Sequence, residues 1–166
     1  IELVRMVGGV PVVVTAGEAE GFKLTAEKLA AAVTPKTKAL MINNPSNPSG
    51  MAYSREELQA LADVCVKNDL YVISDEIYAC LMYDGKTFTS FAALGDEVKE
   101  RTILVNGVSK AYAMTGWRIG YSCSNAHIAK VMANYVSHST GSPCAISQKA
   151  PAAALTGPQD EVETMR

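Results

Sequence analysis

The feature of this sequence that most constrains its fold is the alternation of short apolar runs with helix-forming segments. Apolar runs with the length and composition of buried strands occupy residues 38–43, 70–74 and 101–106. Strands that alternate with helices along a chain are typical of a largely parallel sheet with helices on both of its faces. The sequence therefore predicts an α/β domain built around a mostly parallel sheet.

The clearest helix signal follows the first of these apolar runs. Ser54 and Glu57 have the spacing of a capping box, and apolar residues then recur at helical spacing as far as Cys65. Thr25 is a good N-cap for a second helix, which Pro35 would end. Helices are accordingly predicted over residues 25–33, 54–68, 124–137 and 145–155.

Two further strands are predicted near the two ends of this pattern. Val10–Thr15 is a β-branched run that ends near a glycine, and Arg118–Ser122 follows the third apolar run after a turn. No repeat or linker interrupts the 166 residues, so they are expected to form one domain or most of one. The absence of an initiator Met before Ile1 indicates a piece of a larger protein.

Composition and charge argue against several classes of partner. Apolar residues make up 48% of the chain and charged residues 19%, which is typical of a globular domain. A net charge of -2 gives no electrostatic reason to expect nucleic-acid or membrane binding, and no apolar run is long enough to cross a bilayer. The four cysteines are scattered, which predicts reduced thiols in a cytoplasmic protein and no metal site.

Polar residues follow three of the predicted strands at the point where each strand ends. Each has an ordinary structural reading: Asn47 as a turn former, Asp75 as a helix cap, Tyr78 as packing, and Lys110, preceded by Ser109, as a surface charge. Ligands in open α/β sheets lie beyond the carboxyl ends of the strands, and these residues would meet there. Their coincidence at one edge favours a functional site.

This set of groups suits catalysis with an aldehyde cofactor. A lysine amine forms a Schiff base with an aldehyde, and a carboxylate pairs with a protonated pyridine nitrogen. A phenol and an amide can donate hydrogen bonds to the ring oxygen, while a guanidinium and a hydroxyl can hold a phosphate. The chain supplies these groups in Lys110, Asp75, Tyr78, Asn47, Arg118 and Ser109.

The segments NNPSNPSG, ISDEIYACLMYDG and NGVSKAYAMTGWRIGY resemble motifs of class I/II pyridoxal-phosphate aminotransferases, the aspartate aminotransferase superfamily of fold type I. GFKLTAEKLAAAVTPKTKAL and YSREELQALADV resemble its bacterial aspartate aminotransferase branch. The resemblance covers nearly the whole chain. It implies that residues 1–166 are a partial, three-layer cofactor-binding large domain, without its upstream part and without the C-terminal small domain.

Carried over residue by residue, the resemblance assigns a role to each polar group. It implies that Lys110 forms the Schiff base with pyridoxal 5'-phosphate and then moves the substrate α-proton. Asp75 would pair with the pyridine nitrogen. Tyr78 and Asn47 would contact the 3'-oxygen of the ring, while Arg118 and Ser109 would bind the phosphate.

The resemblance also implies which groups this chain does not supply. Gly107 stands where the family often has a further hydroxyl residue, and Trp117 is expected to pack in the scaffold instead of stacking on the cofactor. The stacking aromatic and another phosphate-binding turn would lie upstream, and the arginine for the substrate carboxylate would lie beyond Arg166. The chain alone is therefore expected to bind the cofactor poorly and to be inactive.

The function implied is that of a transaminase (EC 2.6.1.-), a homodimeric cytoplasmic enzyme of amino-acid metabolism. It would move an amino group between a small amino acid, with aspartate considered first, and a 2-oxo acid. The same scaffold also supports C–S β-lyases, and an aminotransferase-like effector domain of a transcription regulator is a second alternative. A different nucleotide-binding α/β domain is disfavoured, because neither G-x-G-x-x-G nor a P-loop follows the early strands.

Overall fold

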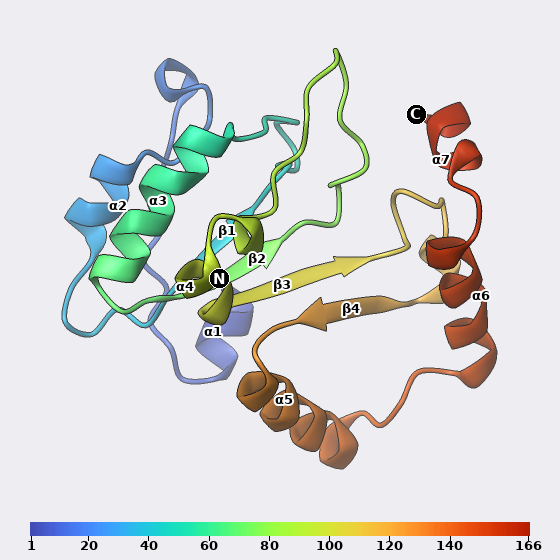
Figure 1. Ribbon diagram of the computed structural model, residues 1–166. Helices are drawn as coiled ribbons and strands as arrows, with labels where there is room; N and C mark the ends of the chain where they lie inside the picture. Colours follow the sequence, from blue (N-terminus) through green and yellow to red (C-terminus); the bar gives the residue numbers. More distant parts are fainter.

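The computed structural model describes residues 1–166 and has a four-stranded sheet at its centre (Figure 1). The strands are β1 (Ala39–Asn43), β2 (Tyr71–Asp75), β3 (Thr102–Gly107) and β4 (Gly120–Cys123), in the spatial order β1-β2-β3-β4. The pairs β1–β2 and β2–β3 are parallel, and β4 is antiparallel to β3. The mostly parallel α/β sheet predicted from the sequence is confirmed.

Seven α-helices accompany the sheet, and the two capping signals in the sequence mark where two of them begin. Ser54 Oγ accepts a hydrogen bond from Glu57 N at 3.2 Å, and Glu57 Oε2 accepts one from Ser54 N at 2.7 Å. Thr25 Oγ1 caps the next helix upstream by accepting from Lys28 N. The helices are α1 (Glu2–Met6), α2 (Ala26–Ala32), α3 (Arg55–Lys67), α4 (Asp96–Glu100), α5 (Ala126–Ser139), α6 (Ala145–Thr156) and α7 (Asp160–Met165).

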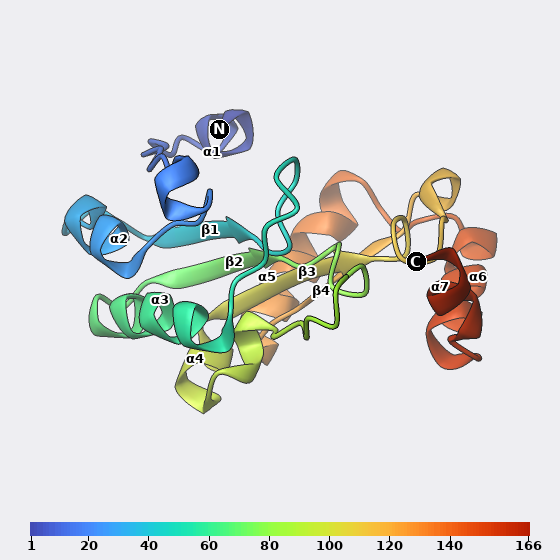
Figure 2. The same ribbon diagram turned by 90° about the horizontal axis from the view of Figure 1, so that it is seen from above.

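One face of the sheet packs against helices and forms the core. Figure 2 shows α3 and α4 on the same side of the strands. Leu61 of α3 is 0% exposed and lies in one apolar cluster with Leu40 of β1, Val72 of β2 and Leu29 of α2. We term this side the covered face, because helical side chains exclude water from it.

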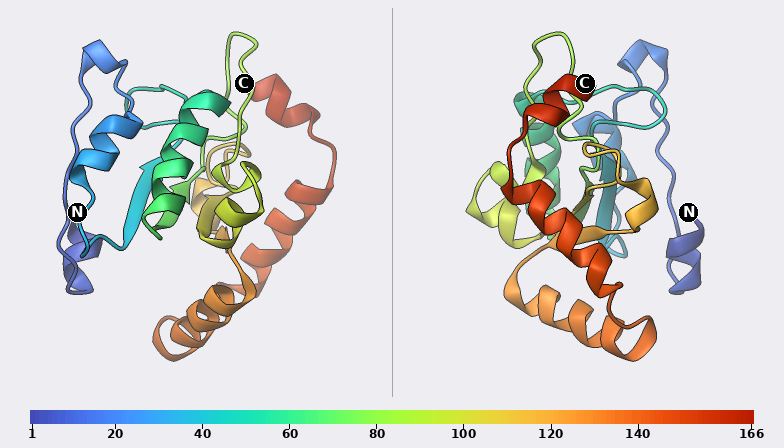
Figure 3. Two further views of the ribbon diagram at one scale, coloured as in Figure 1. Left: turned by 60° about the vertical axis from the view of Figure 1, so that its left-hand side comes forward. Right: turned by 90° about the vertical axis from the view of Figure 1, so that its right-hand side faces the viewer.

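The opposite side of the sheet, here termed the open face, carries alternate residues of the same strands. Met41, Tyr71 and Val105 are exposed there, Met41 to 55%. Figures 1 and 3 place α5 and α6 toward β4, away from α2 and α3. No residue of α5 is buried. The helices that contribute side chains to the apolar core are α2, α3 and α4, and they pack on the covered face.

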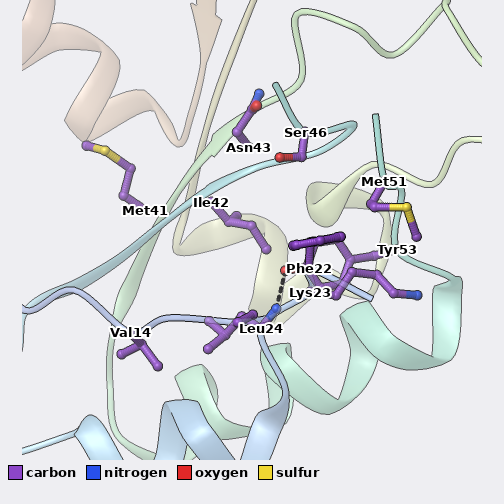
Figure 4. Close-up of a pocket in the computed structure, with 11 residues that line it drawn as sticks. Val14, Phe22, Lys23, Leu24, Met41, Ile42, Asn43, Ser46, Met51 and Tyr53 are labelled. Atoms are coloured by element: carbon purple, nitrogen blue, oxygen red, sulfur yellow. Dashed lines mark hydrogen bonds between the residues drawn. The ribbon is translucent and has the colours of Figure 1, made fainter. Parts of the chain in front are cut away.

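The strand predicted over Val10–Thr15 is wrong, because this segment forms neither helix nor strand. β1 is the edge of the sheet, so no partner strand pairs with the segment, and Val10 is 86% exposed. A cavity of about 240 Å³ lies between the segment and β1 (Figure 4). β-branched residues fit well on a pleated sheet surface, but a segment rich in them forms a strand only where a neighbouring strand can pair with it.

A short 3-10 turn, Thr115–Trp117, connects β3 to β4. Trp117 is 40% exposed, so the expectation that it packs in the scaffold is wrong for this chain, where the turn projects beyond the sheet. β4 starts at Gly120 and not at Arg118, because Arg118 has a left-handed backbone with φ of 57°. No helix combines the length and the apolar character that crossing a membrane requires.

Candidate active site

The predicted site residues come together at the carboxyl edge of the parallel strands. In the sheet register Asn43 of β1 lies beside Asp75 of β2, and Asp75 lies beside Val105 of β3. The loops that leave these three strands carry Asn47, Tyr78 and Lys110. Because β4 runs antiparallel, with Gly120 opposite the last residue of β3, the turn that holds Arg118 starts from the same edge.

Lys110, Tyr78 and Asn47 form one cluster across three strand ends. The Lys110 Nζ atom lies 5.7 Å from the centroid of the Tyr78 ring, within the range of a cation–π contact. Asn47 Nδ2 donates a hydrogen bond of 3.4 Å to Tyr78 Oη. The amine and the amide are exposed and the phenol is half-buried, so all three remain open to a ligand.

Asp75 is the last residue of β2 and lies on the open face. Its Oδ1 atom accepts a hydrogen bond from Ile77 N at 3.1 Å, and no side-chain donor of the chain bonds to Oδ2. Its carbonyl oxygen accepts from Asn44 N at 2.9 Å and from Asn43 Nδ2 at 3.2 Å. The main chain and one carboxylate oxygen are thereby held, and the second oxygen is available to a ligand.

Glu76, the next residue, lies on the covered face and has a different role. It is 2% exposed, and its Oε1 atom accepts hydrogen bonds from Ser74 Oγ, Ser90 Oγ and Phe91 N, each 3.0 Å long. Burial raises the pKa of this carboxyl above its ordinary value. Sequence reasoning gave Glu76 no role, although strand alternation from Val72 through Ser74 could have placed it on the buried side.

The two groups expected at a phosphate are near the cluster but are not bonded to it. Arg118 is exposed, and its Nη1 atom donates to Thr115 O at 2.9 Å. Ser109 is half-buried and makes no side-chain hydrogen bond to the other site residues. The structure therefore brings Asn47, Tyr78 and Lys110 into contact, and leaves Arg118 and Ser109 at the same edge without a shared partner.

Gly107 is the last residue of β3 and lies where β3 and β4 approach closely. A Cβ atom at Gly107 would lie 2.9 Å from the carbonyl oxygen of Ile119 and 3.1 Å from the Cα of Gly120. A hydroxyl residue at this position would have to push β4 away. The close approach of the two strands therefore accounts for the glycine.

Together the fold and the cluster define a class of protein. It is an α/β domain that presents an amine, a carboxylate and a phenol–amide pair at the carboxyl edge of a mostly parallel sheet, a donor set that suits an aldehyde cofactor with a protonated ring nitrogen. The family model described as aminotransferase class I and II matches residues 1–166. The chain belongs to this family.

Individual relatives agree with the family. An aspartate aminotransferase of Bacillus sp. (strain YM-2) is 50% identical over 165 residues, which cover 99% of this chain and 42% of that protein. The aspartate aminotransferase of Bacillus subtilis is 49% identical over the same length. The crystal structure of the aspartate aminotransferase from Rhizobium meliloti matches 98% of this chain and 41% of its own chain, with 44% identity and a TM-score of 0.95. The chain thus spans about two fifths of the length of these relatives.

Proposed function

We propose that this chain is part of a pyridoxal-phosphate-dependent aminotransferase. The enzyme moves an amino group between a small amino acid, with aspartate as the first candidate, and a 2-oxo acid. The observation that carries the proposal is the cluster of Lys110, Tyr78 and Asn47 beside Asp75, in a chain whose relatives are named aspartate aminotransferase. Because the chain spans 42% of those relatives, the activity is proposed for a longer protein that contains it.

The residues present fit pyridoxal 5'-phosphate. When bound, this cofactor supplies an aldehyde that condenses with amines and a ring that withdraws electrons from the carbon beside the bound nitrogen. The free Oδ2 atom of Asp75 can pair with a protonated ring nitrogen, since Oδ1 is already held by Ile77 N. Arg118 and Ser109 lie at the same edge and would hold the phosphate, Arg118 through the guanidinium nitrogens that Thr115 O does not engage.

Tyr78 would be able to donate a hydrogen bond to the cofactor's 3'-oxygen. Asn47 Nδ2 donates to Tyr78 Oη, so the oxygen acts as acceptor in that bond and the hydroxyl proton stays free. The second hydrogen of the Asn47 amide is also free. Two donors can therefore converge on one oxygen, which lowers the free energy of a negative charge there.

Lys110 is the catalytic base of the proposal. Its amine lies on an exposed loop next to the Tyr78 ring, so it can reach a substrate held at the strand ends. As an unprotonated amine, Lys110 would take the proton from the substrate Cα, hold it on Nζ and later return it to the substrate side. A positioned amine of this kind contributes roughly 10²- to 10⁴-fold to the rate.

Residues 1–166 are, in this proposal, part of the large domain of a cytoplasmic homodimer. The exposed side chains of Met41, Tyr71 and Val105 on the open face support further covering segments. Val131 and Tyr135 are exposed on α5 and suit contact with a second subunit. All four cysteines are free, which is usual for a cytoplasmic protein.

A spectrum and an assay of the longer protein test the function. With pyridoxal phosphate it should show a visible absorption band, and with aspartate and 2-oxoglutarate it should form glutamate. Lys110→Ala should remove both the band and the activity, while Lys130→Ala, which removes an exposed lysine of α5, should keep both. Transamination would be contradicted by a wild-type protein that forms no glutamate from aspartate and 2-oxoglutarate but releases homocysteine, pyruvate and ammonia from cystathionine. A band that survives Lys110→Ala would contradict the role of Lys110.

A further inference from the structure

We propose that Asn43 is a positioning residue that holds the loop after β1 at a fixed distance from the end of β2. The inference rests on the proposed function, because Asn47 in that loop and Asp75 at the end of β2 are expected to contact the cofactor. Asn43 is the last residue of β1, and its side chain lies at the rim of the cavity with its amide turned away from Ile42 and Leu24 (Figure 4). No cofactor contact is assigned to Asn43 itself.

The two ends of the Asn43 amide bond to two different segments of the chain. Its Oδ1 atom accepts a hydrogen bond of 2.8 Å from the backbone N–H of Asn47. Its Nδ2 atom donates one of 3.2 Å to the backbone carbonyl of Asp75. One planar group thus links the loop after β1 to the end of β2.

These bonds close a ring of contacts around the site. Asn47, held at its backbone by Asn43, donates from its side chain to Tyr78 Oη. Tyr78 is connected to Asp75 through the backbone of the intervening residues, and the carbonyl of Asp75 accepts a hydrogen bond from Asn43. Removing Asn43 opens the ring, and the position of Asn47 relative to Asp75 then depends on the backbone and on the single 3.4 Å bond from Asn47 to Tyr78.

The place of Asn43 in the sheet explains why a side chain is needed there. Asn43 and Asp75 are the last registered pair of β1 and β2, and the bond from Asn44 N to Asp75 O is the backbone bond beyond that pair. After this point the two chains separate into their loops. The Asn43 amide acts as one additional peptide group, with an acceptor and a donor, and so extends the ladder to Asn47.

Two substitutions separate the halves of this link. Asn43→Ala removes both hydrogen bonds. Asn43→Asp keeps an acceptor for Asn47 N–H but has no donor for the Asp75 carbonyl, and it places a negative charge beside that oxygen. Lys110, Asp75, Tyr78 and Arg118, the ionisable groups at this edge, are unchanged in both variants.

Asn125 provides a matched control in another part of the chain. Its Oδ1 atom accepts from Ile128 N at 2.9 Å, and its Nδ2 atom donates to Glu100 O at 2.8 Å. It therefore links two segments with the same pattern of bonds, at the start of α5. Asn125→Ala and Asn125→Asp reproduce the chemical changes away from the site.

The experiment measures three quantities in the longer protein. For Asn43→Ala we expect the dissociation constant for pyridoxal phosphate to rise about tenfold. We expect the midpoint pH of the visible band to rise by about half a unit, because weaker donation to the 3'-oxygen favours the protonated cofactor. In the cofactor-free Asn43→Ala protein, the backbone N–H of Asn47 should exchange with deuterium roughly tenfold faster than in wild type. Asn43→Asp should keep the slow exchange and still weaken cofactor binding.

The control variants and the cofactor-free measurement decide between the outcomes. Unchanged binding, midpoint and exchange in Asn43→Ala would overturn the inference, and so would equal changes in Asn125→Ala. If the wild-type protein shows no visible band with pyridoxal phosphate, the proposed function fails. The exchange rate of the Asn47 backbone N–H then still shows whether Asn43 holds the loop, since this measurement requires no cofactor.

Discussion

The same strands form both faces of the sheet, but one face forms the core and the other leads to the candidate site. On the covered face Leu40, Val72 and Ser74 are buried under the helices. On the open face Met41 and Tyr71 are exposed, and the row ends in the polar residues of the candidate site. Successive residues of a strand point to opposite sides, so one substitution can test one face at a time.

Asp75 and Glu76 show this difference most directly, because they are adjacent carboxylates. Asp75 lies on the open face and keeps one oxygen for a ligand. Glu76 lies under the sheet and accepts three hydrogen bonds from groups of the chain itself. Two neighbouring acidic residues can therefore serve a site and a scaffold, and the side of the strand decides which.

The largest expected effect comes from Asp75→Asn. In the longer protein this change keeps the side-chain shape and the acceptor for Ile77 N, but it removes the charge that pairs with the ring nitrogen. We expect transaminase turnover to fall about a thousandfold, with the melting temperature almost unchanged. Steady-state kinetics and a thermal melt measure the two quantities.

Glu76→Gln is the matched control for this substitution. It neutralises the adjacent carboxylate and retains an amide oxygen for the same donors, so turnover should stay within about threefold of wild type. Equal losses of turnover in the two variants would contradict the division between the faces.

The next largest effect concerns stability. Leu61, 0% exposed on the covered face, should cost about 3 kcal/mol of unfolding free energy when replaced by Ala. Met41, 55% exposed on the open face, should cost less than about 1 kcal/mol in the 166-residue chain. Urea denaturation of both variants measures the difference.

The same pair of variants sharpens the domain proposal. In the longer protein the open face is proposed to be covered, so Met41→Ala should cost about 2 kcal/mol there. If its cost stays as small as in the 166-residue chain, the open face is not covered and residues 1–166 are not a partial domain.

The covered face could be predicted from the sequence because its signals are local. The apolar runs at β1, β2 and β3 and the capping box at Ser54 each act within a few residues, and all four appear in the structure. The site could be predicted because parallel strands bring their carboxyl ends to one edge, which places Asn47, Tyr78 and Lys110 together.

The elements that sequence reasoning missed depend on partners distant in the chain. Asn43 bonds to Asp75 across 32 positions, and Glu76 bonds to Phe91 across 15. Val10–Thr15 has the composition of a strand but no strand beside it. Composition and spacing describe what a residue can do, and these outcomes depend on which residues the fold brings near.

The pH dependence of stability tests the covered face at Glu76. Burial raises the pKa of this carboxyl in the folded state, so its contribution to stability is fully present below its ordinary value of 4.5. The contribution is lost as the pH rises through the folded pKa, because the buried carboxylate must then carry a charge. The unfolding free energy of wild type relative to Glu76→Gln should therefore fall as the pH rises above the ordinary value of 4.5.

Denaturant unfolding of both proteins at several pH values measures this difference. A wild type that gains stability over Glu76→Gln as the pH rises would show that the three hydrogen bonds outweigh burial. The pKa of Glu76 would then be lowered by folding, and the expected direction would be wrong.

The smallest expected effect on activity is that of cysteine alkylation, so this test follows the rate of alkylation at each cysteine. Burial on the covered face raises the pKa of Cys65 to about 11, whereas hydrogen bonds from the backbone N–H groups of Ser147 and Ile146 lower the pKa of the exposed Cys144. The thiolate is the reactive form, so iodoacetamide at neutral pH should modify Cys144 first and Cys65 at least about a hundredfold more slowly. Mass spectrometry of the peptides gives each rate. Cys65 should reach the rate of the exposed Cys80 only in denaturant, and a fast reaction of Cys65 in the native protein would show that helix α3 does not seal the covered face.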